Sequence, residues 1–128
     1  MPTKVSELLR LRFRCDPSAP RLARDAIREL DGIAAVREDA TLVVSELVTN
    51  AVRHSGGGSG DQLELAVERT PGGLTISVWD VGRSSTSPRL RRRDASPGGL
   101  GLHIVVAVAR SWGVDDGAGR RVWADLPI

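Results

Sequence analysis

The sequence predicts an α+β fold in which helices cover one face of a mostly antiparallel sheet, so that the domain forms a two-layer sandwich. Several short segments alternate apolar and polar residues with period two, which is typical of strands with one wetted face. Other segments carry an apolar stripe at helical spacing on one side only. Elements that are apolar on one side bury that side against each other, and two layers satisfy both types.

Length and composition are those of one ordinary globular domain spanning residues 1–128. The chain has 128 residues, of which 41% are hydrophobic and 27% charged. Its formal net charge of +2 does not by itself indicate a nucleic-acid-binding protein. Cys15 is the single cysteine, which excludes an internal disulfide and a cysteine metal cluster.

We expect no membrane contact and a cytoplasmic location. No apolar run approaches the roughly 18–20 residues that cross a bilayer. Arg10, Arg12 and Arg14 interrupt the N-terminal region where a signal peptide would need its apolar core.

The first half of the chain predicts one strand and two helices. The strand covers 9–15, where apolar residues alternate with charged ones. A Pro-containing break at 16–20 precedes a short helix over 21–30, which Asp-Gly closes. The longest helix begins near Val36 and ends at the Gly/Ser-rich run 55–60.

The middle of the chain predicts a hairpin and then a long loop. Residues 63–68 and 74–79 alternate with period two and are joined by the turn at 70–73. Residues 83–97 have no apolar period and are rich in Ser, Pro and Arg, which predicts a loop.

The last part predicts a helix, a turn and a final strand. Gly98-Gly99-Leu100-Gly101 opens a helix whose inner face extends to Trp112. A turn around 115–119 then leads to a strand over 122–126. The predicted order is therefore strand, helix, helix, strand, strand, helix, strand.

Three polar residues interrupt the pattern of the longest helix. Glu46, Asn50 and His54 are spaced i, i+4, i+8 and form one row along the edge of the apolar stripe. Asn lowers helix propensity and contributes nothing mid-helix in return, which hints at function. A solvated polar margin is the alternative interpretation.

Asp80 breaks the alternation of its strand. Counting by twos from Leu74 places it on the core face, where an unpaired polar group costs about 1–3 kcal/mol. It is either a hydrogen-bond acceptor on the floor of a pocket or a carboxylate that caps a turn with Gly82.

The glycines before the last helix and the arginines before them are open to two interpretations each. Gly98, Gly99 and Gly101 would let backbone N–H groups approach an anion, or would form a plain hinge. Neither a Walker loop nor a dinucleotide fingerprint is present. The arginine-rich run 89–93 is a solvated segment or a contact for phosphate or nucleic acid, although no aromatic residue interleaves with it.

The order of these motifs resembles the ATP-binding fold shared by gyrase, heat-shock chaperones, histidine kinases and the MutL repair proteins. Residues 46–54, the Asp-Val-Gly at 80–82 and the Gly-Leu-Gly-Leu at 99–102 carry the resemblance, which extends to 119–126. The small bacterial anti-sigma-factor serine/threonine kinases and their ATP-binding relatives look most similar. The resemblance implies an α/β sandwich with a mixed sheet.

The resemblance also implies roles for single residues. Asn50 would give an oxygen to Mg²⁺, which the phosphates of ATP also hold. Glu46 would be the general base, and His54 would belong to the nucleotide site. Asp80 would accept a hydrogen bond from the adenine amino group, and Gly82 would keep that turn open.

The same resemblance makes the stretch before the last helix a phosphate site and the loop 83–97 a nucleotide lid. The implied cofactor-binding residues in this stretch are Gly98, Gly99, Leu100, Gly101 and Leu102. Two departures bear on adenine binding. Arg83 and two serines follow the Asp-Val-Gly where relatives often have another glycine, and Arg121 stands where many relatives have threonine.

We therefore expect a cytoplasmic regulator that binds ATP and Mg²⁺, as an anti-sigma-type kinase that phosphorylates a small antagonist protein and exchanges partners with a sigma factor. The alternative is a non-catalytic ATP-binding or ATP-sensing module of the same fold. A fragment of a sensor histidine kinase and a nucleic-acid binder are weaker alternatives, and we expect no direct nucleic-acid contact. A homodimer is a family expectation, for which Leu9, Leu11 and Phe13 on an edge strand are local candidates.

Overall fold

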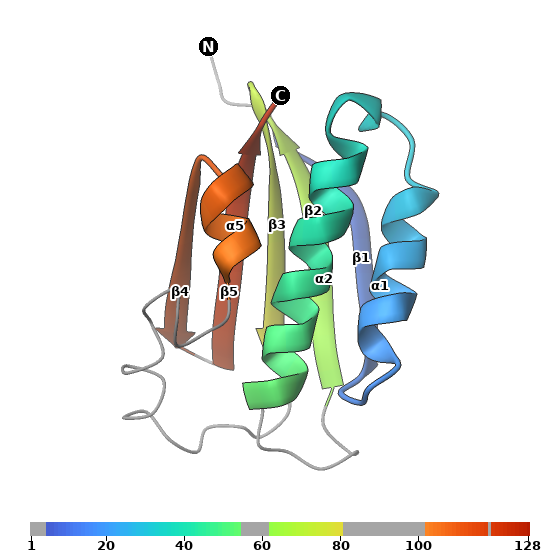
Figure 1. Cartoon of the computed structure of the whole chain (residues 1–128), viewed down its shortest axis with the longest axis vertical. Helices are drawn as coiled ribbons and strands as arrows, with labels where there is room; N and C mark the ends of the chain where they lie inside the picture. The colour runs from blue at the N-terminus through green and yellow to red at the C-terminus, as the bar shows by residue number, and fades with distance from the viewer. Residues whose placement is uncertain (1–4, 55–61, 81–101, 118) are drawn as a thin grey trace.

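The structure, a computed structural model, describes residues 5–54, 62–80, 102–117 and 119–128. Figure 1 shows the helices lying across a single sheet. The elements in chain order are β1 (Ser6–Arg14), α1 (Ala19–Arg28), the short 3₁₀ helix η1 (Ala34–Val36), α2 (Arg37–His54), β2 (Gln62–Thr70), β3 (Gly73–Asp80), α5 (His103–Val108), β4 (Ser111–Gly117) and β5 (Gly119–Pro127).

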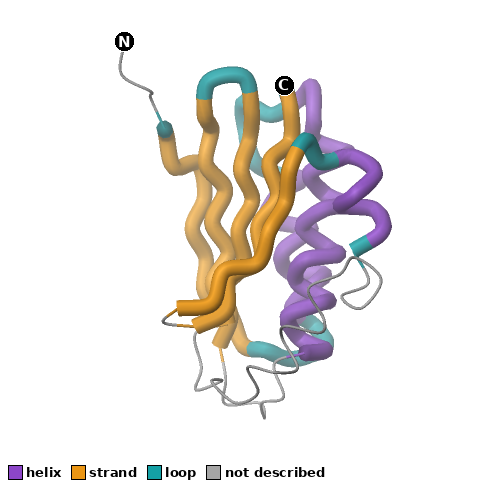
Figure 2. Tube along the Cα trace, turned by 90° about the vertical axis from the view of Figure 1, so that its left-hand side faces the viewer, coloured by secondary structure: helices purple, strands orange, loops and turns teal. Residues whose placement is uncertain are grey.

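The sheet has five strands in the order β1-β2-β3-β5-β4. Each of the four pairings between neighbouring strands is antiparallel. The described helices lie on one side of the sheet, and no described element covers the other face (Figure 2). The predicted two-layer α+β sandwich is confirmed, and the described strands contain no parallel pair of the kind that a mixed sheet would have.

Helix α2 is the central element of the helical layer. Its apolar stripe is buried as the sequence predicts, because α1, α5 and the sheet strands β3 and β5 all pack against it. The stripe residues that are buried are Ala40, Val43, Val44, Leu47, Val48 and Ala51. They meet the inward side chains of the sheet, so one core lies between the two layers.

The edge strand β1 turns its apolar side toward the same core. Leu9 and Leu11 lie opposite Val67 and Leu65 of β2, which are fully buried. Leu9 and Phe13 pack against the buried cluster. These candidates for a dimer interface therefore lie on the helix-covered face of an edge strand, and the dimer stays a prediction.

The last helix is shorter than predicted, and the turn that follows it is a strand. Helix α5 ends at Val108, and residues 111–117 form the edge strand β4. Trp112 and Val114 lie opposite Ala124 and Val122 on β5. The spacing from Val105 to Trp112 fits a helix, but β5 offers this segment a complete row of backbone partners, and periodicity alone does not detect such a partner.

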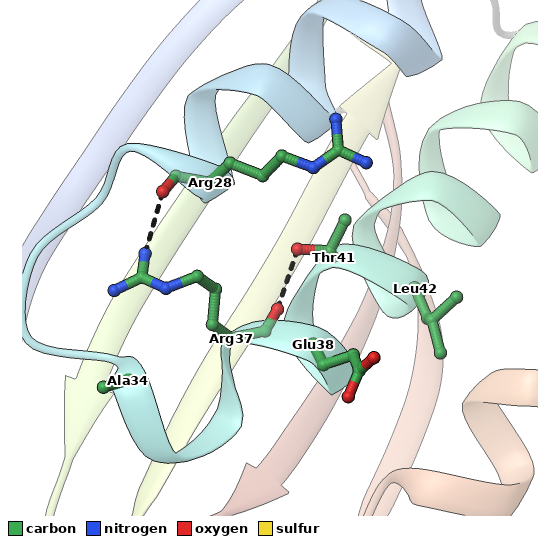
Figure 3. A pocket seen from close by; sticks show the side chains of 6 residues that line it. All are labelled: Arg28, Ala34, Arg37, Glu38, Thr41 and Leu42. Atoms are coloured by element: carbon green, nitrogen blue, oxygen red, sulfur yellow. Dashed lines mark hydrogen bonds between the residues drawn. The ribbon is translucent and has the colours of Figure 1, made fainter.

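Arg37 joins the end of α1 to the start of α2. Its Nη1 donates hydrogen bonds to the carbonyl oxygens of Ile27, Arg28 and Leu30 at 3.4, 3.0 and 2.6 Å (the bond to Arg28 is drawn in Figure 3). These carbonyls lie at the C-terminus of α1, where helical partners run out. A cation there also matches the helix dipole, so Arg37 stabilises the turn between the two helices.

Replacing Arg37 with methionine tests this role. Arg37→Met keeps an apolar stem and removes the donors, so we expect the free energy of unfolding to fall by about 1–3 kcal/mol. Urea denaturation followed by circular dichroism measures it. Arg21→Met, an exposed position on α1, is the matched control. Equal urea midpoints for the two variants would contradict the capping role.

Candidate functional site

Three predicted site segments meet at one edge of the domain. Asn50 lies one turn before the end of α2, Asp80 is the last residue of β3, and Leu102 directly precedes α5. In Figure 1, α2 and β3 end in the lower part of the view, and α5 begins at its lower end, which faces the same side. Since α2 packs against both β3 and α5, this placement is fixed by the core.

Asn50 is a buried carboxamide without a partner among the described residues. Its side chain is 2% exposed. Neither Oδ1 nor Nδ2 makes a hydrogen bond in the described part of the chain. Such a group costs about 1–3 kcal/mol, so a buried amide with both ends unmatched points to a ligand that completes it. Asn50 is therefore buried more deeply than its sequence position, at the edge of the apolar stripe, predicts.

Glu46 lies one helical turn from Asn50 and is partly exposed. Four residues along a helix correspond to a rise of about 6 Å, so the two side chains occupy neighbouring turns. A buried oxygen donor and a solvent-accessible carboxylate thus follow each other on α2. His54 is the last residue of the helix, so its backbone continues the predicted row.

Asp80 faces the core, which confirms the prediction made from strand alternation. It is 5% exposed. In the sheet it lies between Leu63 of β2 and Arg120 of β5. A carboxylate at this depth is suited to accept a hydrogen bond from a donor that enters the edge of the core.

Arg120 is the residue that sequence reasoning missed. It lies directly opposite Asp80 in the β3–β5 ladder and is 8% exposed on the same face. Directly opposed residues have Cβ atoms about 4.5–5.5 Å apart, so the guanidinium belongs to the surroundings of the Asp80 carboxylate. Counting by twos from Val122 would have placed Arg120 inward.

Arg121 lies on the opposite face from Asp80, so it does not stand beside the residue that the resemblance assigns to the adenine. Its Nη1 donates to Asp115 at 2.8 Å, and its Nη2 donates to the hydroxyl of Ser77 at 2.9 Å. Its guanidinium also lies over the rings of Trp79 and Trp123. The physical reason is that successive side chains of a β-strand point to opposite faces of the sheet, so Arg120 and Arg121 of β5 lie on different faces.

Gly119 brings the start of β5 against the end of β3. Its φ of +122° is one that residues with a side chain rarely adopt. A Cβ at this position would lie 2.9 Å from the carbonyl oxygen of Asp80. Glycine is therefore required here, and it permits the close approach that sets Arg120 opposite Asp80.

Several predicted site residues lie outside the described residues. These are Gly82, Gly98, Gly99, Leu100 and Gly101, together with the lid expected over 83–97. Leu102 is described: it is fully buried, and its carbonyl oxygen accepts the first backbone hydrogen bond of α5, from Val106 at 3.0 Å.

A pocket of about 610 Å³ lies elsewhere, between the end of α1 and the start of α2 (Figure 3). Its lining includes Arg28, Glu38 and Leu42 as well as Arg37, whose guanidinium is bound to the α1 carbonyls. Glu38 is twelve residues from Asn50, which corresponds to about 18 Å along α2. The pocket is therefore separate from the candidate site.

The described ranges contain neither a metal-ligand cluster nor a membrane-spanning helix. No group of three or more His, Cys, Asp or Glu side chains there is placed to hold a metal ion. No helix in that part of the chain is both long and apolar enough to cross a membrane.

Comparison with known proteins assigns the chain to a family. No curated protein matches the sequence. A family model described as a histidine kinase-like ATPase domain matches residues 13–125, which include Glu46, Asn50, Asp80 and Arg120. The match covers α1, α2, α5 and the strands β2, β3 and β4 in full, all but the last two residues of β5, and the last two residues of β1. The chain therefore belongs to the histidine kinase-like ATPase domain family.

Proposed function

We propose that this protein binds Mg²⁺-ATP and acts as an anti-sigma-type serine/threonine kinase on a small antagonist protein. The observation that carries the proposal is the buried carboxamide of Asn50, whose two polar atoms have no partner among the described residues. Glu46 stands one turn away, and Asp80 lies at the same edge of the domain. Membership of the ATPase domain family supports the ATP-binding part.

The residues present fit a magnesium ion shared with phosphates. A carboxamide oxygen is a donor of the type that Mg²⁺ accepts, and this ion usually takes few protein ligands and keeps waters. Asn50 Oδ1 would hold it, and phosphate oxygens would complete the set. When bound, the ion neutralises negative charge on the phosphates.

Glu46 would take the proton from the hydroxyl of the protein substrate. It is partly exposed, so a serine or threonine side chain of a second protein can reach it. A carboxylate that accepts a proton as the hydroxyl attacks contributes about 10²–10⁴-fold to a reaction rate. Asp80 would bind the adenine amino group, which orients the nucleotide for this attack.

The proposed setting follows from the same resemblance. The substrate would be an anti-sigma antagonist, and the kinase would exchange between this protein and a sigma factor. We propose a cytoplasmic location, where both partners would be found.

A non-catalytic ATP-binding module is the second candidate, and Arg120 is the observation that favours it. A guanidinium on the same face as the Asp80 carboxylate competes with the adenine amino group for that carboxylate. Weak or altered nucleotide binding would suit a sensor that changes partners on binding, without phosphoryl transfer.

Asn50→Leu tests the metal-binding role. Leucine fills a similar volume and removes an unmatched buried amide, so we expect unchanged or higher thermal stability. Calorimetric titration with ATP should show at least about a ten-fold loss of affinity in Mg²⁺, since a charge-assisted contact is removed. Wild-type protein in EDTA is the control. Equal affinity of the variant and the wild type in Mg²⁺ would contradict the role of Asn50.

Glu46→Gln separates binding from catalysis. We expect ATP affinity to stay near that of the wild type, and transfer of labelled phosphate to a protein in lysate to fall by about 10²–10⁴-fold. Glu38→Gln, on the same helix but at its other end, is the matched control. Undiminished transfer in Glu46→Gln rules out the general base, and binding without transfer in the wild type supports the second candidate.

Arg120→Thr tests the competition for Asp80. We expect a lower melting temperature of the free protein, because the Asp80 carboxylate loses the cation opposite it, and tighter ATP binding. Arg121→Thr makes the same replacement one residue later on the other face and should leave ATP affinity unchanged. Weaker ATP binding in Arg120→Thr would show instead that Arg120 itself contacts the nucleotide.

A further inference from the structure

The pocket of about 610 Å³ between the end of α1 and the start of α2 has no part in the proposed function (Figure 3). Its volume is within the range of about 300–1,000 Å³ that is typical of small-molecule sites. The Arg37 guanidinium donates to the carbonyl oxygens at the end of α1, and the Ala34 side chain is a single methyl group, so neither residue fills the space. The pocket is therefore built into the junction of the two helices.

Two walls of the pocket carry opposite charges. Arg28 lines it from the end of α1, and Glu38 lines it from the first turn of α2. In Figure 3 the Arg28 guanidinium and the Glu38 carboxylate lie at opposite ends of the group of side chains, with Thr41 between them. Within the described residues Arg28 pairs not with Glu38 but with Asp25, at 3.4 Å, and both members of that pair are more than half exposed. Such an exposed pair is weak, so Arg28 can bind an anionic group.

The space between the two charges is lined by an aliphatic side chain and a hydroxyl group. Leu42 is 43% exposed and lies outside the buried stripe of α2. An exposed leucine is ordinary on a protein surface, but this one lines a cavity in which a ligand can cover it. Thr41 Oγ1 donates to the carbonyl oxygen of Arg37 at 2.7 Å, a bond drawn in Figure 3, so its oxygen can still accept a hydrogen bond.

We propose that this pocket binds a small zwitterion, an amino acid or dipeptide with an aliphatic side chain. The carboxylate of the ligand would pair with Arg28, its ammonium group with Glu38, and its side chain would cover Leu42. Each charged wall thereby receives a group of opposite charge, and apolar surface is removed from water.

The charges in the first turn of α2 distinguish this ligand from a phosphate compound. The N-terminus of a helix attracts anions, but Glu38 and Asp39 occupy the first turn here. These carboxylates repel a polyphosphate, so a second nucleotide does not suit the pocket. A purely apolar ligand would remove water from two charged groups without pairing them, which is unfavourable.

The proposed ligand site does not depend on the proposed kinase function. Glu38 is about 18 Å from Asn50 along α2, so the two sites share no residue. The titrations require no nucleotide, and their outcome is separate from that of the ATP experiments.

Nuclear magnetic resonance titration of the full-length ¹⁵N-labelled protein with leucyl-leucine tests the proposal. A second titration with L-leucine presents the same two charged groups closer together. We expect the backbone amide signals of Thr41 and Leu42 to shift in at least one titration, with a dissociation constant of about 1 mM or below. If neither compound shifts these signals, the proposal is overturned.

Charge removal on the protein and on the dipeptide identifies the polar contacts. Arg28→Gln should weaken leucyl-leucine about five-fold and leave the affinity of its C-terminal amide, which lacks the carboxylate, unchanged. Glu38→Gln should have the same effect on leucyl-leucine and none on its N-acetyl derivative, which lacks the ammonium group. Arg21→Gln, on the exposed part of α1, is the matched control for Arg28. Unchanged affinity for leucyl-leucine in either variant, or an equal loss for the modified compound, would overturn the assignment of the charged groups.

Leu42→Gln tests the apolar contact. We expect leucyl-leucine to bind about five-fold more weakly, because less apolar surface is buried, and circular dichroism checks that the helices are intact. Leu22→Gln replaces a leucine on α1 that is 47% exposed and should bind like the wild type. Undiminished binding to Leu42→Gln, or an equal loss in Leu22→Gln, would show that the aliphatic chain does not occupy this pocket.

Discussion

The packing of α2 across the inner face of the sheet is the interaction on which the rest of the structure depends. The helix buries an apolar stripe against the sheet and also contacts α1 and α5. These contacts along α2 fix the position of the helix. Asn50 is therefore held in the buried layer, although its side chain has no hydrogen-bond partner among the described residues. The favourable burial of the stripe offsets the cost of that amide, which leaves it available for a ligand.

Side chains alternate along each strand, so the sheet has one face toward the helices and one face toward solvent. On β3 and β5, Asp80 and Arg120 point inward, and their immediate neighbours Trp79 and Arg121 point outward. Two arginines adjacent in sequence thus have unrelated surroundings. One borders the candidate nucleotide site, and the other stacks on the open face. A shift of one residue in this pairing would exchange them, so the register of one ladder decides both surfaces.

Membership of the histidine kinase-like ATPase domain family is compatible with a kinase and with a nucleotide-dependent binding module. Within the chain, Glu46 favours the kinase and Arg120 favours the binding module. A partly exposed carboxylate one turn from Asn50 is suited to proton transfer. A buried guanidinium lies opposite Asp80 and changes what this end of the candidate site offers to a ligand.

The sequence by itself was sufficient to predict the helices and strands that carry a long row of apolar residues on one side. These include α2, the hairpin of β2 and β3, and the inward direction of Asp80, because period and burial are local properties of the chain. The pattern also led to the correct fold class and family. Among the site residues, the row from Glu46 to Asn50 was visible as a polar interruption of a stripe.

Only the tertiary structure decided where backbone partners are available. Residues 111–117 became a strand because β5 lay beside them, although Trp112 continues a helical spacing. The ladder between β3 and β5 set Arg120, not Arg121, beside Asp80. These relations join residues that are distant in the sequence. They depend on pairing between strands, which the period of a single segment does not encode.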